Sequence, residues 1–121
     1  MSNIELGKKG EAIALAFLEA KGYRMLEMNW RIDHYEVDLI LVSEDQIVFV
    51  EVKFRTSEDY GDPSEAVHHN KRRNLIKAAH LYIVKNRISL DPRFDIVAIT
   101  EKENAPPKII HFEEAFYPVA R

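Results

Sequence analysis

Residues 35–55 decide the fold, and they read Tyr-Glu-Val-Asp-Leu-Ile-Leu-Val-Ser-Glu-Asp-Gln-Ile-Val-Phe-Val-Glu-Val-Lys-Phe-Arg. Two apolar segments flank a polar turn at 43–46, which predicts two strands joined as a hairpin. Because side chains alternate along a strand, Glu51 and Lys53 should share one face with Phe49, while the valines between them take the other. Both faces are apolar before Glu51, so we expect a central strand that is covered on both sides.

Charged residues interrupt both predicted strands, with Asp38 in the first and Glu51 and Lys53 in the second. An unpaired buried charge is costly, so these groups need partners, a metal or a ligand. Two carboxylates can hold Mg²⁺, and a neighbouring lysine can orient a water molecule or stabilise negative charge, which suits phosphodiester hydrolysis. The alternative is a structural salt-bridge cluster at a strand end, and the spacing leaves both interpretations open.

Length and composition limit the class of protein. The 121 residues are close to the commonest domain size, so we expect residues 1–121 to form one domain. The chain has no cysteine, which excludes disulfides and thiolate metal sites. It has neither a signal-peptide core nor a long apolar run, so we expect a cytoplasmic protein without membrane contact. The net charge of -3 means that any nucleic-acid binding must depend on local basic patches or bound cations.

The pattern along the chain predicts one α/β domain of order α-β-β-β-α-β-β, with a central mixed sheet of about five strands flanked by helices. Ser2 and Glu5 have capping-box spacing, and Gly22 is a natural helix stop, so the first helix should lie between Ser2 and Gly22. We expect the remaining elements in this order: strands at 23–32, 35–42 and 46–54, a helix at 63–86, strands at 93–100 and 108–112, and one helical turn at 113–117. The first three strands should pair antiparallel, and the last strand should lie at an edge.

Charged residues on the two helices add candidates for a site. Glu11 falls on the apolar stripe of the first helix, where the ordinary interpretation is a boundary residue paired with Lys8 or another nearby lysine. Lys71 falls on the apolar stripe of the second helix and could therefore point inward. Arg72 and Arg73 face outward, where they are either simply solvated or in contact with phosphate.

Several blocks spread along nearly the whole chain carry a family resemblance: Gly7-Lys-Lys-Gly10-Glu11, Gly22-Tyr23, Asn29-Trp30-Arg31, 36–40, 49–55, 61–67, Lys71, Ala79 and Arg93-Phe94-Asp95. Through them the sequence resembles the YraN-like family of small bacterial proteins. That family has a restriction-endonuclease-like, PD-(D/E)xK fold similar to archaeal Holliday-junction resolvases. One departure is Tyr35, where the family usually has glycine, and this residue could crowd the turn beside the site.

The resemblance implies a Mg²⁺ or Mn²⁺ site and a role for each of its residues: Asp38, Glu51 and the Val52 carbonyl as metal ligands, Lys53 as the catalytic lysine, Glu11 as an acid that assists metal binding, and Lys71 as a basic residue from the next helix. The corresponding expectation is a metal-dependent endonuclease-like protein that acts on structured or branched DNA. The rivals are a non-catalytic nucleic-acid-binding module and a protein-interaction adaptor. Whether the chain forms a homodimer stays open.

The loop after Lys53 and the start of the second helix should border such a site. Four basic residues fall at or near this border: Arg55, Lys71, Arg72 and Arg73. Unpaired N–H groups at a helix N-terminus also favour phosphate. We therefore expect a phosphate backbone to cross this edge, with Arg72 and Arg73 in contact with it outside the site.

Overall fold

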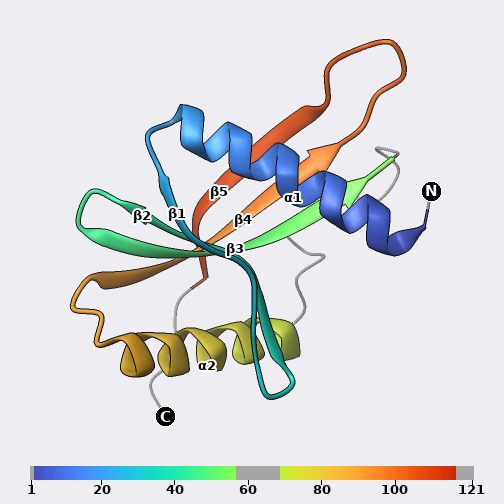
Figure 1. Cartoon of the computed structure of the whole chain (residues 1–121). Helices are drawn as coiled ribbons and strands as arrows, with labels where there is room; N and C mark the ends of the chain where they lie inside the picture. Colours follow the sequence, from blue (N-terminus) through green and yellow to red (C-terminus); the bar gives the residue numbers. More distant parts are fainter. Residues whose placement is uncertain (1, 57–68, 117–121) are drawn as a thin grey trace.

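A mixed sheet lies between two helices in a computed structural model of the chain, which describes residues 2–56 and 69–116 (Figure 1). The elements are α1 (Asn3–Ala20), β1 (Arg24–Ile32), β2 (Tyr35–Ser43), β3 (Gln46–Arg55), α2 (His69–Asn86), β4 (Asp91–Thr100) and β5 (Lys108–Phe116). The five strands lie in chain order, and β3 pairs with β4 in parallel while the other neighbouring pairs are antiparallel. This confirms the predicted α/β order, the meander and the position of the last strand at an edge.

Helix α1 begins and ends where its capping residues predict. The Ser2 hydroxyl accepts a hydrogen bond from the Glu5 N–H at 3.1 Å. Gly22 adopts a φ of +96°, a conformation that glycine reaches without steric cost. The Tyr23 N–H then donates to the Leu18 carbonyl at 3.1 Å, which completes a Schellman-type end. The predicted start of the second helix at Pro63, and most of the loop before it, lie outside the described residues.

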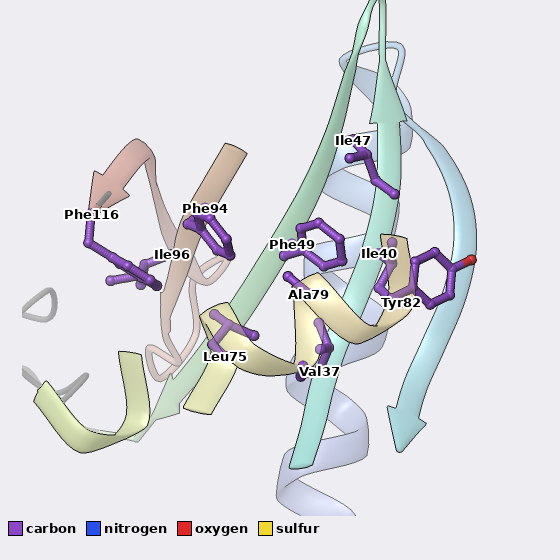
Figure 2. Close-up of a cluster of buried hydrophobic side chains, with 11 residues drawn as sticks. Val37, Ile40, Ile47, Phe49, Leu75, Ala79, Tyr82, Phe94, Ile96 and Phe116 are labelled. Atoms are coloured by element: carbon purple, nitrogen blue, oxygen red, sulfur yellow. The ribbon is translucent and has the colours of Figure 1, made fainter. Parts of the chain in front are cut away.

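The sheet has an apolar core on each face. The core on the α2 side, shown in Figure 2, contains Val37, Ile40, Ile47, Phe49, Leu75, Ala78, Ala79, Tyr82, Phe94, Ile96 and Phe116. The core on the α1 side contains Ala14, Leu18, Tyr23, Leu39, Leu41, Val48, Val50, Val97 and Ile99. Phe49 and Val50 therefore face opposite layers and are both fully buried. The alternation and the two-sided burial predicted for this strand are confirmed.

The last strand is longer than predicted, and the helical turn expected at 113–117 is wrong over the described residues. Strand β5 continues to Phe116, whose ring stacks on Phe94 at a centroid distance of 5.4 Å. Glu114 has a φ of 50°, and its N–H donates to the Asp95 carboxylate at 3.1 Å. A buried acceptor on the neighbouring strand thus stabilises an irregular extended backbone, a cause that the local sequence does not reveal.

The described residues include no helix long and apolar enough to cross a lipid bilayer.

Candidate functional site

Strands β2 and β3 separate at the point where charge enters the sheet. Their ladder runs from Ser43 paired with Gln46 to Leu39 paired with Val50, although β2 begins earlier and β3 continues to Arg55. Beyond the last pair, the Asp38 carboxylate accepts a hydrogen bond from the Val52 N–H at 2.9 Å. A side chain therefore occupies the place of a backbone acceptor, and this opens room between the two strands.

A cavity of about 330 Å³ lies at this separation. Residues from four elements line it: Leu6, Gly7 and Glu11 of α1, Asp38 of β2, Glu51, Val52 and Phe54 of β3, and Lys71 of α2. Lys53 lies close by, with its Nζ atom 4.0 Å from Glu51 Oε1. The structure thus brings together the six residues that the resemblance implied, five as lining residues and Lys53 beside them.

Glu51 is the most deeply buried carboxylate of the cavity, with only 4% of its surface exposed. The alternation of β3 directs it toward the α2 side, where Lys71 forms an ion pair with it. The inward orientation predicted for Lys71 is therefore confirmed. Since the Lys71 side chain is about half exposed, at 48%, it connects a buried charge to the surface.

Asp38 has a strongly perturbed acidity. Burial and, after it, the negative charge of Glu51 raise its pKa to about 8, from an ordinary value of 3.8. The hydrogen bond from Val52 opposes this shift, and Glu11 adds to it. Asp38 therefore holds a proton near neutral pH, because burial disfavours its charged form and the nearby Glu51 carboxylate repels a second negative charge.

Glu11 faces the cavity, where the ordinary interpretation had paired it with a lysine on its own helix. Burial raises its pKa, and the charges of nearby Glu36 and Glu51 act in the same direction. Hydrogen bonds from Asn29 and Asp38 lower the pKa and partly offset the effect. Glu11 is thus held among acidic groups by hydrogen bonding.

Asn29 is the site residue whose role the sequence reasoning missed. It lies in β1 between Met28, which pairs with Leu39, and Trp30, which pairs with Val37. Its φ is 53°, in the left-handed region that asparagine tolerates better than most residues. The available signal was an asparagine inside a predicted strand, where this residue type is depleted.

The two lysines of the site differ in acidity. Burial lowers the pKa of Lys53, and the positive charge of Lys71 lowers it further. Burial also acts to lower the pKa of Lys71, but its contact with Glu51 outweighs this and leaves the pKa raised. Lys71 is therefore a stable cation, whereas Lys53 gives up its proton more readily than an ordinary lysine.

The oxygen atoms in this cavity are of the type that binds a hard divalent cation such as Mg²⁺. Asp38 and Glu51 supply carboxylate oxygens, and the neighbouring Val52 supplies a backbone carbonyl; Mg²⁺ is commonly bound by one or two carboxylates and several waters. A cation would also relieve the repulsion that raises the pKa of Asp38. Within residues 2–56 and 69–116, no group of three or more histidine, aspartate or glutamate side chains is placed to hold a metal. The implied role of Glu11 in metal binding therefore stays a prediction.

Comparison with known proteins places this site in a family. The model described as "Uncharacterised protein family UPF0102" matches residues 10–99, a range that includes Glu11, Asp38, Glu51, Lys53 and Lys71. The chain belongs to this family. The match supports the resemblance to the YraN-like family that the sequence blocks indicated.

Relatives of this UPF0102 chain cover nearly its whole length. UPF0102 protein FP2501 of Flavobacterium psychrophilum is 45% identical over 113 residues, which cover 93% of this chain and 94% of the relative. A UPF0102 protein of Bacteroides thetaiotaomicron is 41% identical over 114 residues, with 94% and 93% covered. UPF0102 protein THEYE_A1950 of Thermodesulfovibrio yellowstonii is 41% identical over 117 residues, with 97% and 100% covered.

The basic residues of the UPF0102 chain that were predicted to contact phosphate occupy different settings. Arg55 ends β3 and is partly buried, and its carbonyl accepts the Glu101 N–H at 2.8 Å. Arg72 is also partly buried, with its guanidinium carbon 5.3 Å from the centre of the Phe116 ring. Arg73 is exposed. Most of the loop that was expected to border the site lies within 57–68, outside the described residues.

Tyr35, which departs from the family pattern, packs away from the cavity. It is partly buried against the α2-side core, its ring lies 4.1 Å from that of His34, and the Lys77 ammonium group lies 5.8 Å from its centre. Tyr35 is not among the lining residues of the cavity. Tyr35 therefore does not fill the cavity, and its ring packs against His34 of the adjacent turn.

A second polar cluster, which the sequence reasoning also missed, lies in the α1-side layer. Arg93 and Asp95 form a buried pair, with guanidinium nitrogens 2.9 and 2.8 Å from the carboxylate oxygens. Tyr23 accepts a further hydrogen bond from Arg93, and His111 Nε2 lies 2.7 Å from Asp95. Since its charges and polar groups are paired within the protein, we interpret this cluster as structural. Its signal was an arginine and an aspartate two residues apart on one face of an apolar strand.

Proposed function

We propose that this protein is a metal-dependent endonuclease-like enzyme that acts on structured or branched DNA. The observation that carries the proposal is the meeting of Asp38 and Glu51 in one cavity, at the point where their strands separate. Lys53 and Lys71 lie beside this carboxylate pair. Two carboxylates that raise each other's energy can be stabilised by a bound cation, and two amines lie beside them. These are the groups that hydrolysis of a phosphodiester needs.

Each side chain has a distinct part in the proposed chemistry. A bound Mg²⁺ or Mn²⁺ would lower the pKa of a water molecule and neutralise charge on a phosphoryl oxygen. Asp38 and Glu51, with the Val52 carbonyl, would hold this ion. Lys53, whose pKa is lowered, would orient the water or hold a proton beside the reacting phosphate. Lys71 stays cationic and keeps the Glu51 carboxylate in place.

The proposed contact with DNA depends on local positive charge, because the whole chain carries -3. Arg72 and Arg73 at the start of the described part of α2, and Arg55 at the end of β3, are the proposed phosphate-contacting residues. Such contacts release counterions, so the affinity should fall as salt rises. Replacing Arg72 and Arg73 by alanine should weaken binding about equally across sequences and reduce the salt slope by roughly one to two charges.

Cleavage of DNA tests the proposal directly. Purified protein is incubated with labelled four-way-junction, flap and single-stranded DNA in Mg²⁺ or Mn²⁺, beside Glu51→Ala and Lys53→Ala. Glu19→Ala is the matched control, because Glu19-Ala20-Lys21 repeats the Glu-x-Lys spacing and Glu19 is exposed on α1. We expect the two site variants to lose cleavage and the control to retain it. Cleavage that survives Glu51→Ala would come from a contaminant or another site and would refute the proposed mechanism.

Metal binding is tested separately from cleavage. Titration with Mn²⁺, followed by water proton relaxation, should show a site in the wild type that is lost in Asp38→Asn. Equal binding by the two proteins would remove the principal support for a metal-dependent reaction.

The structure also gives a reason to keep a second function, a nucleic-acid-binding module that does not cleave. Both carboxylates have partners within the protein: Glu51 has Lys71, and Asp38 has the Val52 N–H. If the wild type binds the junction with a salt dependence but cleaves no substrate in either metal, this second function is the correct one. If the wild type does not bind the junction at all, a protein-interaction adaptor is the remaining function.

A further inference from the structure

Two glycines of α1 have different reasons to be glycine. At Gly10 a side chain would not fit, because its Cβ would lie 2.8 Å from the Cβ of Phe54. At Gly7 no atom of residues 2–56 and 69–116 lies within 4 Å of such a Cβ, and the backbone is not in the left-handed region. Glycine within a helix lowers stability relative to alanine. Packing therefore explains Gly10, whereas the described part of the chain supplies no packing reason for Gly7.

The position of Gly7 beside the cavity suggests why this residue is a glycine. Gly7 lines the cavity, one i to i+4 step before Glu11 on the same helix stripe. Because Cα–Cβ bonds tilt toward the N-terminus of a helix, the Glu11 side chain leans over the turn that contains Gly7. The missing side chain therefore leaves this wall of the carboxylate cavity uncovered, and the helix backbone itself forms the surface.

We infer that Gly7 is a substrate-positioning residue, at which the sugar-phosphate backbone of the DNA comes into close contact with the backbone of α1 beside Glu11. A glycine permits such an approach, which any side chain would prevent. The inference rests on the proposed function, since it names the wall of the same site along which the substrate lies. Helix α1 would then contact the substrate, which explains a glycine that does not benefit the stability of the helix.

The test compares Gly7→Ala and Gly7→Gln with Ala12→Gln. Ala12 is the control because it is exposed on the same helix and is not a lining residue of the cavity. Three quantities are measured: the melting temperature, the Kd for a fluorescein-labelled four-way junction by anisotropy in EDTA, and the affinity for Mn²⁺ by relaxation. The KM and kcat of junction cleavage are measured in Mg²⁺.

We expect both Gly7 variants to melt at or above the wild-type temperature and to bind Mn²⁺ normally. Gly7→Gln should raise the Kd and the KM for the junction roughly tenfold or more, Gly7→Ala should raise them less, and Ala12→Gln should stay within about twofold of the wild type. A merely structural role would instead lower the melting temperature.

Unchanged junction binding and KM in Gly7→Gln, while Glu51→Ala abolishes cleavage, would overturn the inference and leave the proposed function standing. Loss of Mn²⁺ affinity in Gly7→Gln would also overturn it, because the glycine would then serve the carboxylates and not the substrate. A wild-type protein that neither binds nor cleaves DNA would overturn the inference together with the proposed function.

Discussion

The acidity of Asp38 makes a prediction about stability that can be tested without any substrate. Its carboxyl has a pKa of about 8 in the folded protein and should return to about 3.8 on unfolding. Between these values the folded state binds a proton that the unfolded state has released, so the free energy of unfolding falls as pH rises. The fall is about 1.4 kcal/mol for each pH unit, which is at most about 4 kcal/mol between pH 5 and pH 8.

Asp38→Asn removes this titration and keeps the shape of the protonated side chain. The amide oxygen can still accept the hydrogen bond that Val52 donates to Asp38. We expect the variant to become more stable relative to the wild type as pH rises. Since Asp38 is only partly buried by surface area, the relative gain from pH 5 to pH 9 should be about 2 to 4 kcal/mol.

The assay is urea unfolding of both proteins in EDTA at several pH values from 5 to 9. Comparing the two proteins at each pH cancels the titration of all other groups. A difference in unfolding free energy that stays constant across this range would refute the argument that repulsion and burial keep Asp38 protonated. In the presence of Mn²⁺, the wild type alone should gain stability, and its Mn²⁺ affinity should rise from pH 6 to pH 8 because binding must displace the proton.

Three further changes test other parts of the structure. Asp95→Ala should lower the free energy of unfolding by about 3 to 5 kcal/mol, measured by urea unfolding at pH 7, because it removes the buried carboxylate that pairs with the Arg93 guanidinium. Gly10→Ala should lower it by about 1 to 3 kcal/mol in the same assay, since the added Cβ meets the Cβ of Phe54. An unchanged stability would mean that α1 and β3 move apart there without cost. Lys71→Gln should raise the pKa of Asp38 further, because it removes a positive charge that lowers this pKa, and NMR titration of the Asp38 side-chain carboxyl checks the direction.

Much of the architecture follows from patterns within short stretches of the chain. The alternation around Phe49 and Glu51 is a property of any extended strand, and it correctly assigns the two faces of β3. The start and end of α1 follow from Ser2 and Gly22, because a cap is satisfied by backbone groups only a few residues away. These features are local in physical origin, and they were therefore predictable from the sequence.

The residues of the candidate site could be named from the family resemblance, but their electrostatics could not. The pKa of Asp38 depends on how far β2 and β3 separate beyond the Leu39–Val50 pair, which places its carboxylate near Glu51. The contact between Asn29 and Glu11 joins β1 to α1, and Asn29 has a left-handed backbone inside its strand. No local pattern specifies such distances.

The error at the end of β5 has the same origin. Residues 113–116 carry no local signal that distinguishes an irregular strand from a helical turn, and the deciding groups lie about twenty residues earlier in the chain. Asp95 binds the Glu114 N–H, and Phe94 stacks on Phe116, so β4 holds the segment extended. The sequence by itself determined the order of the two helices and five strands and the two faces of β3, since both depend on neighbouring residues. Only the tertiary structure decided which charges share a buried cavity, because solvent exclusion and Coulomb repulsion depend on distances across separate elements.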